Sequence, residues 1–154
     1  MMGSTMRRGM AAGLAGGAAE ILWIAAYSAV TGTPAGPVAR GVTAALIPGL
    51  DTLPSAPLIG ITLHMLLAVA LGMAVAAALR APMLRAVGGW SQSLLVVLVL
   101  AAVWSFNFLV LLPGFDPGFV TLLPMAVTLA SKLLFGISAA VVLRSSRPAR
   151  FSTV

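Results

Sequence analysis

The sequence predicts an all-α integral membrane protein with four transmembrane helices. Hydrophobic residues make up 60% of its 154 residues and charged residues only 8%, against about 25% charged residues in soluble domains. Four stretches reach the roughly 20 apolar residues that cross a hydrocarbon core, and turns rich in proline and glycine separate them. This length and pattern predict one domain over residues 1–154.

The predicted transmembrane helices cover residues 10–31, 57–79, 94–112 and 120–143, each within a few residues. Proline-containing turns at residues 33–37, 80–82 and 113–118 end the first three. Arg7 and Arg8 before the first apolar run resemble the start of a signal peptide. Because Glu20 interrupts that run, we expect the segment to be retained as the first helix.

The loop after the first predicted helix is long and contains a further helical pattern. Val38, Val42, Ala45 and Leu46 have the spacing of one helix face, with Arg40 outside that face. The pattern predicts a short interfacial helix over residues 37–47. An ordered cap over the bundle and a functional lid are the alternatives for this segment.

The arginines indicate the orientation of the chain in the membrane. With four spans, only Arg40 falls on one side, and seven arginines fall on the other: Arg7, Arg8, Arg80, Arg85, Arg144, Arg147 and Arg150. The positive-inside rule then places both termini in the cytoplasm. We predict a multi-pass protein of a bacterial inner (plasma) membrane, since the composition rich in alanine and arginine is typical of a high-GC genome.

The two halves of the chain resemble each other. Residues 23–27 and 104–108 are both tryptophan-led aromatic segments before a turn, and both fit an aromatic belt at the membrane interface. The second and fourth predicted helices each carry glycine, alanine and arginine at intervals of four, as Gly72, Ala76 and Arg80 and as Gly136, Ala140 and Arg144. Such similarity arises easily by chance between apolar helices, which is the leading interpretation, and a parallel repeat of two plus two helices is the alternative.

Small residues recur every four positions on three of the predicted helices. Residues four apart lie on one helix face, and small side chains there let helices approach closely in lipid. We expect these stripes to be packing seams within the bundle, with a seat for the helix of a partner as the less favoured alternative. Their members are Gly9, Gly13, Gly17, Ala68, Gly72, Ala76, Gly136 and Ala140.

Four polar residues, Glu20, Lys132, His64 and Asn107, interrupt the predicted helices. A charge at the bilayer centre costs roughly 2.5–3.5 kcal/mol on insertion scales, so it usually has a partner or a function. At about 1.5 Å per residue, Glu20 and Lys132 both lie roughly 16 Å from the outer ends of their helices. His64 and Asn107 lie at shallower positions, and we expect Asn107 to hydrogen-bond across helices. These residues predict an intramembrane polar core with a charged pair at its centre.

Three interpretations of Glu20 and Lys132 remain open at this point. They form a structural ion pair that fixes the register of two helices, they pair with another subunit, or they belong to a transport pathway or proton relay. His64 is a candidate member of a polar path or a buried structural histidine. A single histidine without clustered soft donors does not predict a metal or haem site.

The sequence excludes several functional classes. Without cysteine, it has no disulfide, zinc-thiolate site or iron–sulfur cluster of its own, and the common nucleotide-binding and hydrolase motifs are missing. We therefore expect no enzyme activity from the chain by itself, although it would fit within an enzyme complex. The leading hypothesis is a non-catalytic subunit or assembly partner of a larger membrane complex, for example a respiratory or electron-transport complex. The alternative is a small oligomeric transporter or channel that uses the polar core.

The expected partners follow from the same features. The sequence pI of about 11.8 comes from short basic clusters beside apolar segments, a pattern typical of membrane topology and anionic lipid rather than nucleic acid. We expect contact with the lipid bilayer and with other membrane subunits or further copies of the chain. No intrinsic cofactor is expected, and haem or quinone would come only through a host complex.

Overall fold

The computed structural model describes residues 2–82, 84 and 87–145. Four of its helices are long and apolar enough to cross a membrane: Gly3–Thr31, Ala56–Ala78, Gly89–Phe115 and Met125–Ser145. The described residues form helices and turns, without a strand. The prediction of an all-helical protein with four candidate membrane spans is confirmed.

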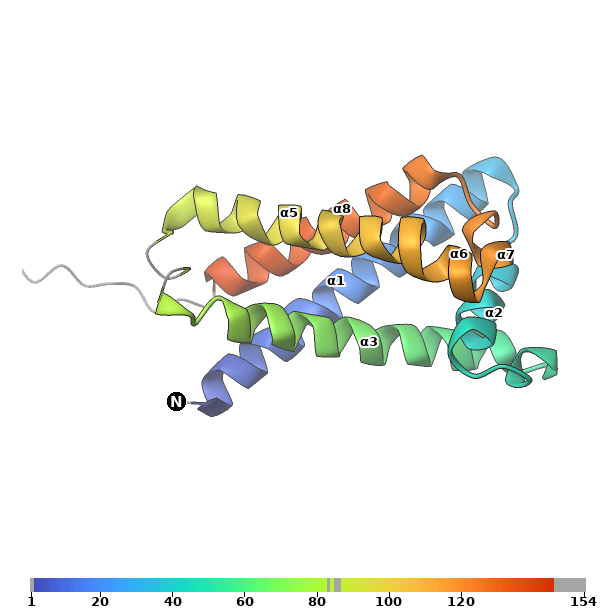
Figure 1. The fold of residues 1–154 in the computed structure, drawn as a ribbon, viewed down its shortest axis with the longest axis horizontal. Helices are drawn as coiled ribbons and strands as arrows, with labels where there is room; N and C mark the ends of the chain where they lie inside the picture. Colours follow the sequence, from blue (N-terminus) through green and yellow to red (C-terminus); the bar gives the residue numbers. More distant parts are fainter. Residues whose placement is uncertain (1, 83, 85–86, 146–154) are drawn as a thin grey trace, which may run out of the picture.

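The chain runs through the helices in the order of their labels in Figure 1. The first half contains α1 (Met2–Thr31), α2 (Ala35–Leu46), the 3-10 turn η1 (Leu50–Thr52) and α3 (Ala56–Ala78). The second half contains α5 (Gly89–Phe106), the π-helix η2 (Asn107–Leu111), α6 (Leu112–Phe115), α7 (Pro117–Val120) and α8 (Met125–Ser145). The helix α1 begins and α8 ends at the same end of the bundle (Figure 1).

The third span differs from the prediction at its C-terminal end. We expected Pro113 to terminate the helix at residue 112, but the helical backbone continues to Phe115. Just before Pro113 the chain widens into the π-helix, where Leu112 donates its backbone N–H to the carbonyl of Asn107. A proline cannot donate to the residue four positions earlier and crowds its carbonyl. The wider π turn accommodates this ring without ending the helix.

The fourth span begins five residues later than the prediction of 120. Residues 117–120 form the separate helix α7, whose N-terminus is capped by Asp116, which accepts a hydrogen bond from the N–H of Phe119 at 3.1 Å. A turn follows, and α8 starts directly after Pro124. Proline is favoured just at a helix start, because its missing N–H is not needed there.

The short helix in the first loop is α2, close to the predicted residues 37–47. It packs on α3, where its buried Thr43 donates a hydrogen bond of 2.6 Å to the carbonyl of Ala56. Arg40 donates to the carbonyl groups of Asp51 and Leu53 and so fastens the loop that follows. These contacts tie α2 to the N-terminal end of α3.

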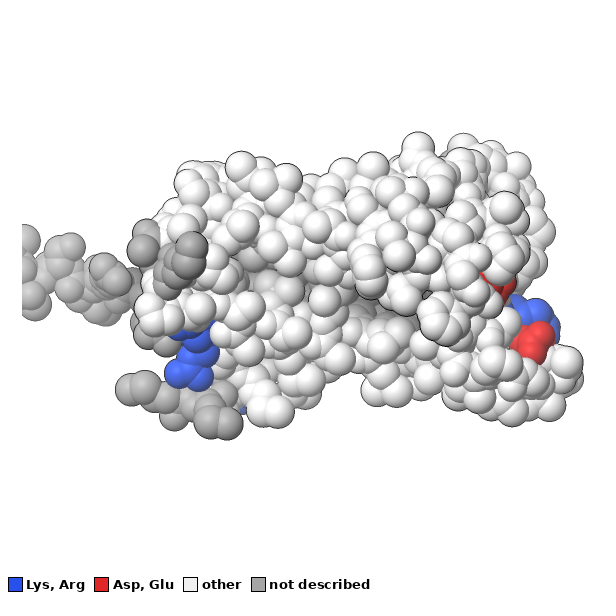
Figure 2. Space-filling model, in the orientation of Figure 1, with Lys and Arg blue, Asp and Glu red and all other residues white. Residues whose placement is uncertain are grey.

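The long helices pack as a series rather than as a closed ring. Extensive interfaces join α3 to α1, α1 to α8 and α8 to α5. Between α3 and α5, the two ends of this series, the described residues form no comparable interface. In Figure 1 these two helices lie along opposite sides of the view, and Figure 2 shows a hollow between the two sides.

The charges lie at the ends and in the interior. Figure 2 shows basic side chains at the end where α1 begins, and both basic and acidic side chains at the opposite end. The middle of this face shows none. Glu20, in the middle of α1, is only 5% exposed, so the surrounding helices bury this charge.

Candidate functional site

Glu20 and Lys132 form an ion pair inside the bundle. The Lys132 Nζ atom of α8 lies 2.8 Å from the Glu20 Oε1 atom of α1. The side chain of Glu20 is 6% exposed and that of Lys132 is 16% exposed. At this distance the pair is a charge-assisted hydrogen bond, and each charge compensates the other within an apolar surrounding.

His64 of α3 faces the other carboxylate oxygen. Its Nε2 atom lies 3.5 Å from Glu20 Oε2, and both atoms are buried without a hydrogen-bond partner among the described residues. The imidazole also has a hydrogen-bonding contact with the backbone of Gly17. Three helices, α1, α3 and α8, therefore bring one acid, one base and one histidine to a single point.

Two glycines beside Glu20 make room for this convergence. A Cβ atom on Gly16 would lie 2.7 Å from the ring of Phe135 on α8, and one on Gly17 would lie 2.8 Å from the Cβ atom of Ala68 on α3. Both distances are shorter than van der Waals contact. Because adjacent glycines face different neighbours, α1 approaches α8 and α3 closely at the same level. Glu20 follows one turn later and reaches both helices.

Lys132 is held from a second side by an aromatic ring. Its Nζ atom lies 4.9 Å from the centroid of Phe135, which is itself fully buried. A cation over a ring face is attracted by the ring quadrupole. Lys132 therefore has two compensating contacts, a carboxylate and an aromatic face, and both come from described residues.

The predicted distance of Lys132 from the end of its helix is wrong, although the residue does meet Glu20. The predicted distance of roughly 16 Å assumes a helix that starts near residue 120, whereas α8 starts at Met125 and Lys132 follows seven residues later, about 10 Å along the helix. The indole of Trp23 on α1 donates to the carbonyl of Val127 at 3.0 Å, which places Trp23 level with the start of α8. The helix α1 extends beyond that level to Thr31, so its residue 20 lies opposite residue 132.

Asn107 does not join the polar core as predicted. It is the first residue of the π-helix η2, and its side chain makes no hydrogen bond within the described part of the chain, so the expected bond across helices is absent there. Trp104 also differs from the expectation of an interfacial belt. Its side chain is buried, stacks on Phe108 and donates to Thr128 at 3.1 Å.

The predicted seam residues occupy the helix interfaces. Gly9, Gly13 and Gly17 of α1 face Ala68, Gly72 and Ala76 of α3, and a Cβ atom on Gly13 would lie 2.6 Å from the Cα atom of Val69. On α8, Gly136 faces Val97 of α5, and Ala140 is buried beside it. Sequence reasoning missed Gly16 and Phe135. The adjacent glycines 16 and 17 were the signal that α1 has two close neighbours.

The cluster does not resemble a metal site. Among the residues that the structure describes, no group of three or more His, Asp or Glu side chains gathers around one point. One carboxylate oxygen of Glu20 contacts the ammonium group of Lys132, which lies where a metal ion would have to bind. Chemically, the arrangement can hold an ion pair of zero net charge between Glu20 and Lys132. The facing atoms of Glu20 and His64 are also close enough to share a proton.

Comparison of this chain with models of protein families, with curated proteins and with solved structures finds no match. The reasoning about function therefore rests on the residues and on their arrangement.

Proposed function

We propose that the chain is a non-catalytic membrane subunit, an assembly or stabilising partner of a larger membrane complex. The observation that carries this proposal is the open series of helices, α3–α1–α8–α5. The end helix α5 packs mainly on α8, and large apolar side chains such as Leu94, Leu98 and Phe106 are more than half exposed along it. A second membrane chain would give α5 the further neighbour that it lacks.

The interior supports the same proposal. Glu20 and Lys132 neutralise each other within the chain, and Glu20 is almost fully buried. A charge pair of this kind fixes which helices meet and in which register. Because the charge pair is buried, the exterior of the long helices remains apolar and can contact lipid and partner helices. Haem or quinone, where present, would belong to the host complex.

The test is gentle detergent extraction from the native membrane, followed by size analysis, mass spectrometry and a visible absorption spectrum. We expect a stoichiometric partner chain. Leu98→Trp on α5 should release that partner, because the larger side chain alters the shape of the docking face. Leu22→Trp on α1 is the matched control, since Leu22 is 69% exposed but lies on another helix.

Two outcomes would contradict the proposal. One is recovery of the chain as a monomer or a homo-oligomer without any other protein. The other is equal loss of the partner in both tryptophan variants, which would indicate a general effect of added bulk rather than docking on α5.

Proton-coupled transport is the second candidate, and one observation favours it. The buried Glu20 Oε2 and His64 Nε2 atoms face each other at 3.5 Å without hydrogen-bond partners in the described residues. A proton shared between them would satisfy both atoms. A side chain that gains and loses such a proton is a component of many membrane pathways.

The double variant Glu20→Gln with Lys132→Met separates the two candidates. It removes both charges together and so leaves no unpaired charge in the bundle. A structural subunit should keep its partner in this variant. A proton-coupled transporter should lose proton flux into liposomes, measured with an enclosed pH-sensitive dye.

A further inference from the structure

A groove runs between α5 and α8 at the end where α8 terminates. Its volume is about 520 Å³, within the usual range for small-molecule sites of about 300–1,000 Å³. Apolar side chains form most of its wall, and Arg144, Trp90, Ser91 and Ser93 are its polar or amphipathic members. The groove therefore combines a long apolar surface with a cationic group.

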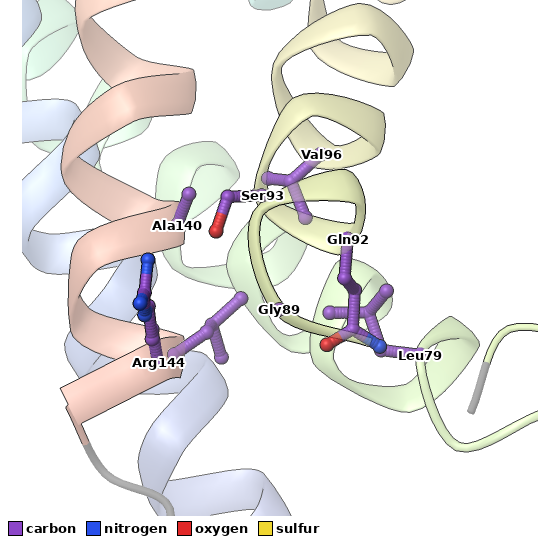
Figure 3. A pocket seen from close by; sticks show the side chains of 8 residues that line it. Leu79, Gly89, Gln92, Ser93, Val96, Ala140 and Arg144 are labelled. Carbon is purple, nitrogen blue, oxygen red and sulfur yellow. The ribbon is translucent and has the colours of Figure 1, made fainter. Parts of the chain in front are cut away.

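The guanidinium group of Arg144 is held in position over an aromatic ring. Its Cζ atom lies 4.4 Å from the ring centroid of Trp90. A cation–π contact with a ring is not a hydrogen bond, so it does not use up the five N–H donors of the guanidinium. In Figure 3, which shows a small cavity beside the groove, the side chain of Arg144 lies along α8 near Ala140, and Ser93 of α5 borders the same cavity. This second cavity has a volume of about 20 Å³, and Gln92 and Leu79 help to line it.

Among the residues that the structure describes, no acidic side chain forms an ion pair with Arg144. The sequence has three acidic residues. Glu20 is paired with Lys132 in the interior, and Asp51 and Asp116 lie in the loops at the other end of the long helices. Arg7, Arg8 and Arg80 add further positive charge at the Arg144 end. Charge complementarity at this groove therefore favours an anion.

The apolar part of the groove selects the kind of anion. Leu94 and Val97 of α5 and Ile137 and Val141 of α8 line it, and Leu94, Ile137 and Val141 are more than half exposed. Free inorganic phosphate would leave these side chains uncovered. A phospholipid would place its phosphate at Arg144 and one acyl chain along them. Basic residues beside a span are a common recognition feature for anionic headgroups.

We propose that the groove between α5 and α8 is a binding site for an anionic phospholipid, whose phosphate is bound by Arg144 and whose acyl chain lies against Leu94, Val97, Ile137 and Val141. Arg144 supplies the selectivity for the headgroup, and Trp90 positions its guanidinium. The site shares Leu94 with the exposed face of α5, but it is tested on the purified chain alone, so the test does not depend on the proposed role as a subunit.

The experiment is native mass spectrometry of the purified full chain, with phosphatidylglycerol or phosphatidylcholine added in equal amounts. We expect phosphatidylglycerol to bind more tightly than phosphatidylcholine. Arg144→Gln should weaken phosphatidylglycerol binding about fivefold, the effect of one basic residue near an anionic surface, and Arg144→Lys should retain part of it. Arg80→Gln, at the same end but outside the groove, should change binding less than twofold.

A second variant tests the apolar part of the site. Ala140→Phe places a ring into the wall that both cavities share, and it should reduce occupancy by phosphatidylglycerol. Circular dichroism and size-exclusion profiles identify any variant that fails to fold, and Leu94→Phe at the exposed edge then provides a milder block. Equal binding of both lipids, unchanged binding in Arg144→Gln, or displacement of the lipid by inorganic phosphate alone would overturn the proposal.

Discussion

The pair α1–α3 and the pair α5–α8 are joined by different kinds of contact. At the first interface glycines face glycine or alanine, and a Cβ atom on Gly72 would lie 2.6 Å from the Cα atom of Gly13. At the second, Val96, Leu100 and Trp104 of α5 are buried as a row of large side chains. The first pair meets through backbone atoms, whereas the second meets through side chains and leaves the groove described above.

This difference has a physical reason. Association of helices in lipid depends on close packing, because lipid tails are as apolar as the side chains. Small residues give extensive contact and leave little free volume. Large residues can leave gaps where they do not interlock, and such gaps accommodate lipid. We therefore expect α1–α3 to be the rigid pair of the bundle and α5–α8 to be the adaptable one.

The largest effect should come from the ion pair that links the two pairs through α1 and α8. Lys132→Met alone leaves Glu20 as a buried charge without its main partner and should lower the free energy of unfolding by roughly 3–5 kcal/mol. Adding Glu20→Gln should restore most of that stability. Unfolding in detergent micelles, followed by circular dichroism, measures both. If the double variant is no more stable than the single one, the two residues do not act as a pair.

The next largest effect should come from Gly13→Ala in the rigid pair. The added methyl group would contact the backbone of Ala68 and Val69, so α1 and α3 must move apart, at a cost of about 1–3 kcal/mol. Gly3→Ala on the same helix is the control, since no atom lies within 4 Å of its added methyl group. It should be neutral or stabilising because alanine favours the helix. Thermal unfolding of both variants tests the difference, and equal midpoints would argue against close backbone packing.

A smaller effect should come from Trp104→Phe in the adaptable pair. The substitution removes the hydrogen bond from the indole to Thr128 across α5 and α8, and we expect a loss of about 0.5–1.5 kcal/mol. Ser105→Ala removes a bond of Ser105 to Ala101 within α5 and should cost less. Chemical unfolding in mixed micelles compares them, and a larger effect of Ser105→Ala would contradict the assigned role of Trp104.

The smallest effect should come from Gly136→Ala, also in the adaptable pair. Its added methyl group would lie 3.1 Å from the Cα atom of Val97, which requires a shift of only a few tenths of an ångström. The better helix propensity of alanine, worth about 1 kcal/mol, offsets this crowding. The thermal midpoint should therefore stay nearly unchanged. A loss as large as that of Gly13→Ala would show that both interfaces are equally close.

The sequence predicted the four membrane spans because apolar length alone determines them. It did not predict the helix ends near proline. Pro113 resembles a helix terminator, but a π turn accommodates it. The apolar run predicts that the fourth helix starts at residue 120, whereas α8 starts directly after Pro124. The outcome at a proline depends on which carbonyl groups surround it in three dimensions, and the pattern of residue types does not contain that information.

The candidate site was predicted in part. Two opposite charges in apolar helices must find compensation, so Glu20 and Lys132 were natural partners, and the structure brings them together. The contact between Phe135 and Lys132 could not be predicted, because an aromatic residue in a membrane helix usually contributes only to apolar packing. Asn107 was misplaced because it lies at the end of α5, which packs mainly on α8, whereas the polar cluster lies where α1, α3 and α8 meet. The residue pattern does not show which helices are neighbours. Whether the halves are a duplication stays a prediction.

The ion pair between α1 and α8 can form only late in the synthesis of the chain. Glu20 is near the beginning of the chain, and Lys132 is made 112 residues later, roughly 6–20 s at ordinary translation rates. In the later part of that interval, after residue 64 is made, the nascent chain contains His64 but not Lys132. The carboxyl group of Glu20 must remain protonated, stay near the lipid–water boundary or rely on the imidazole until the last helix inserts. Membrane integration of this protein is therefore complete only when its final helix arrives.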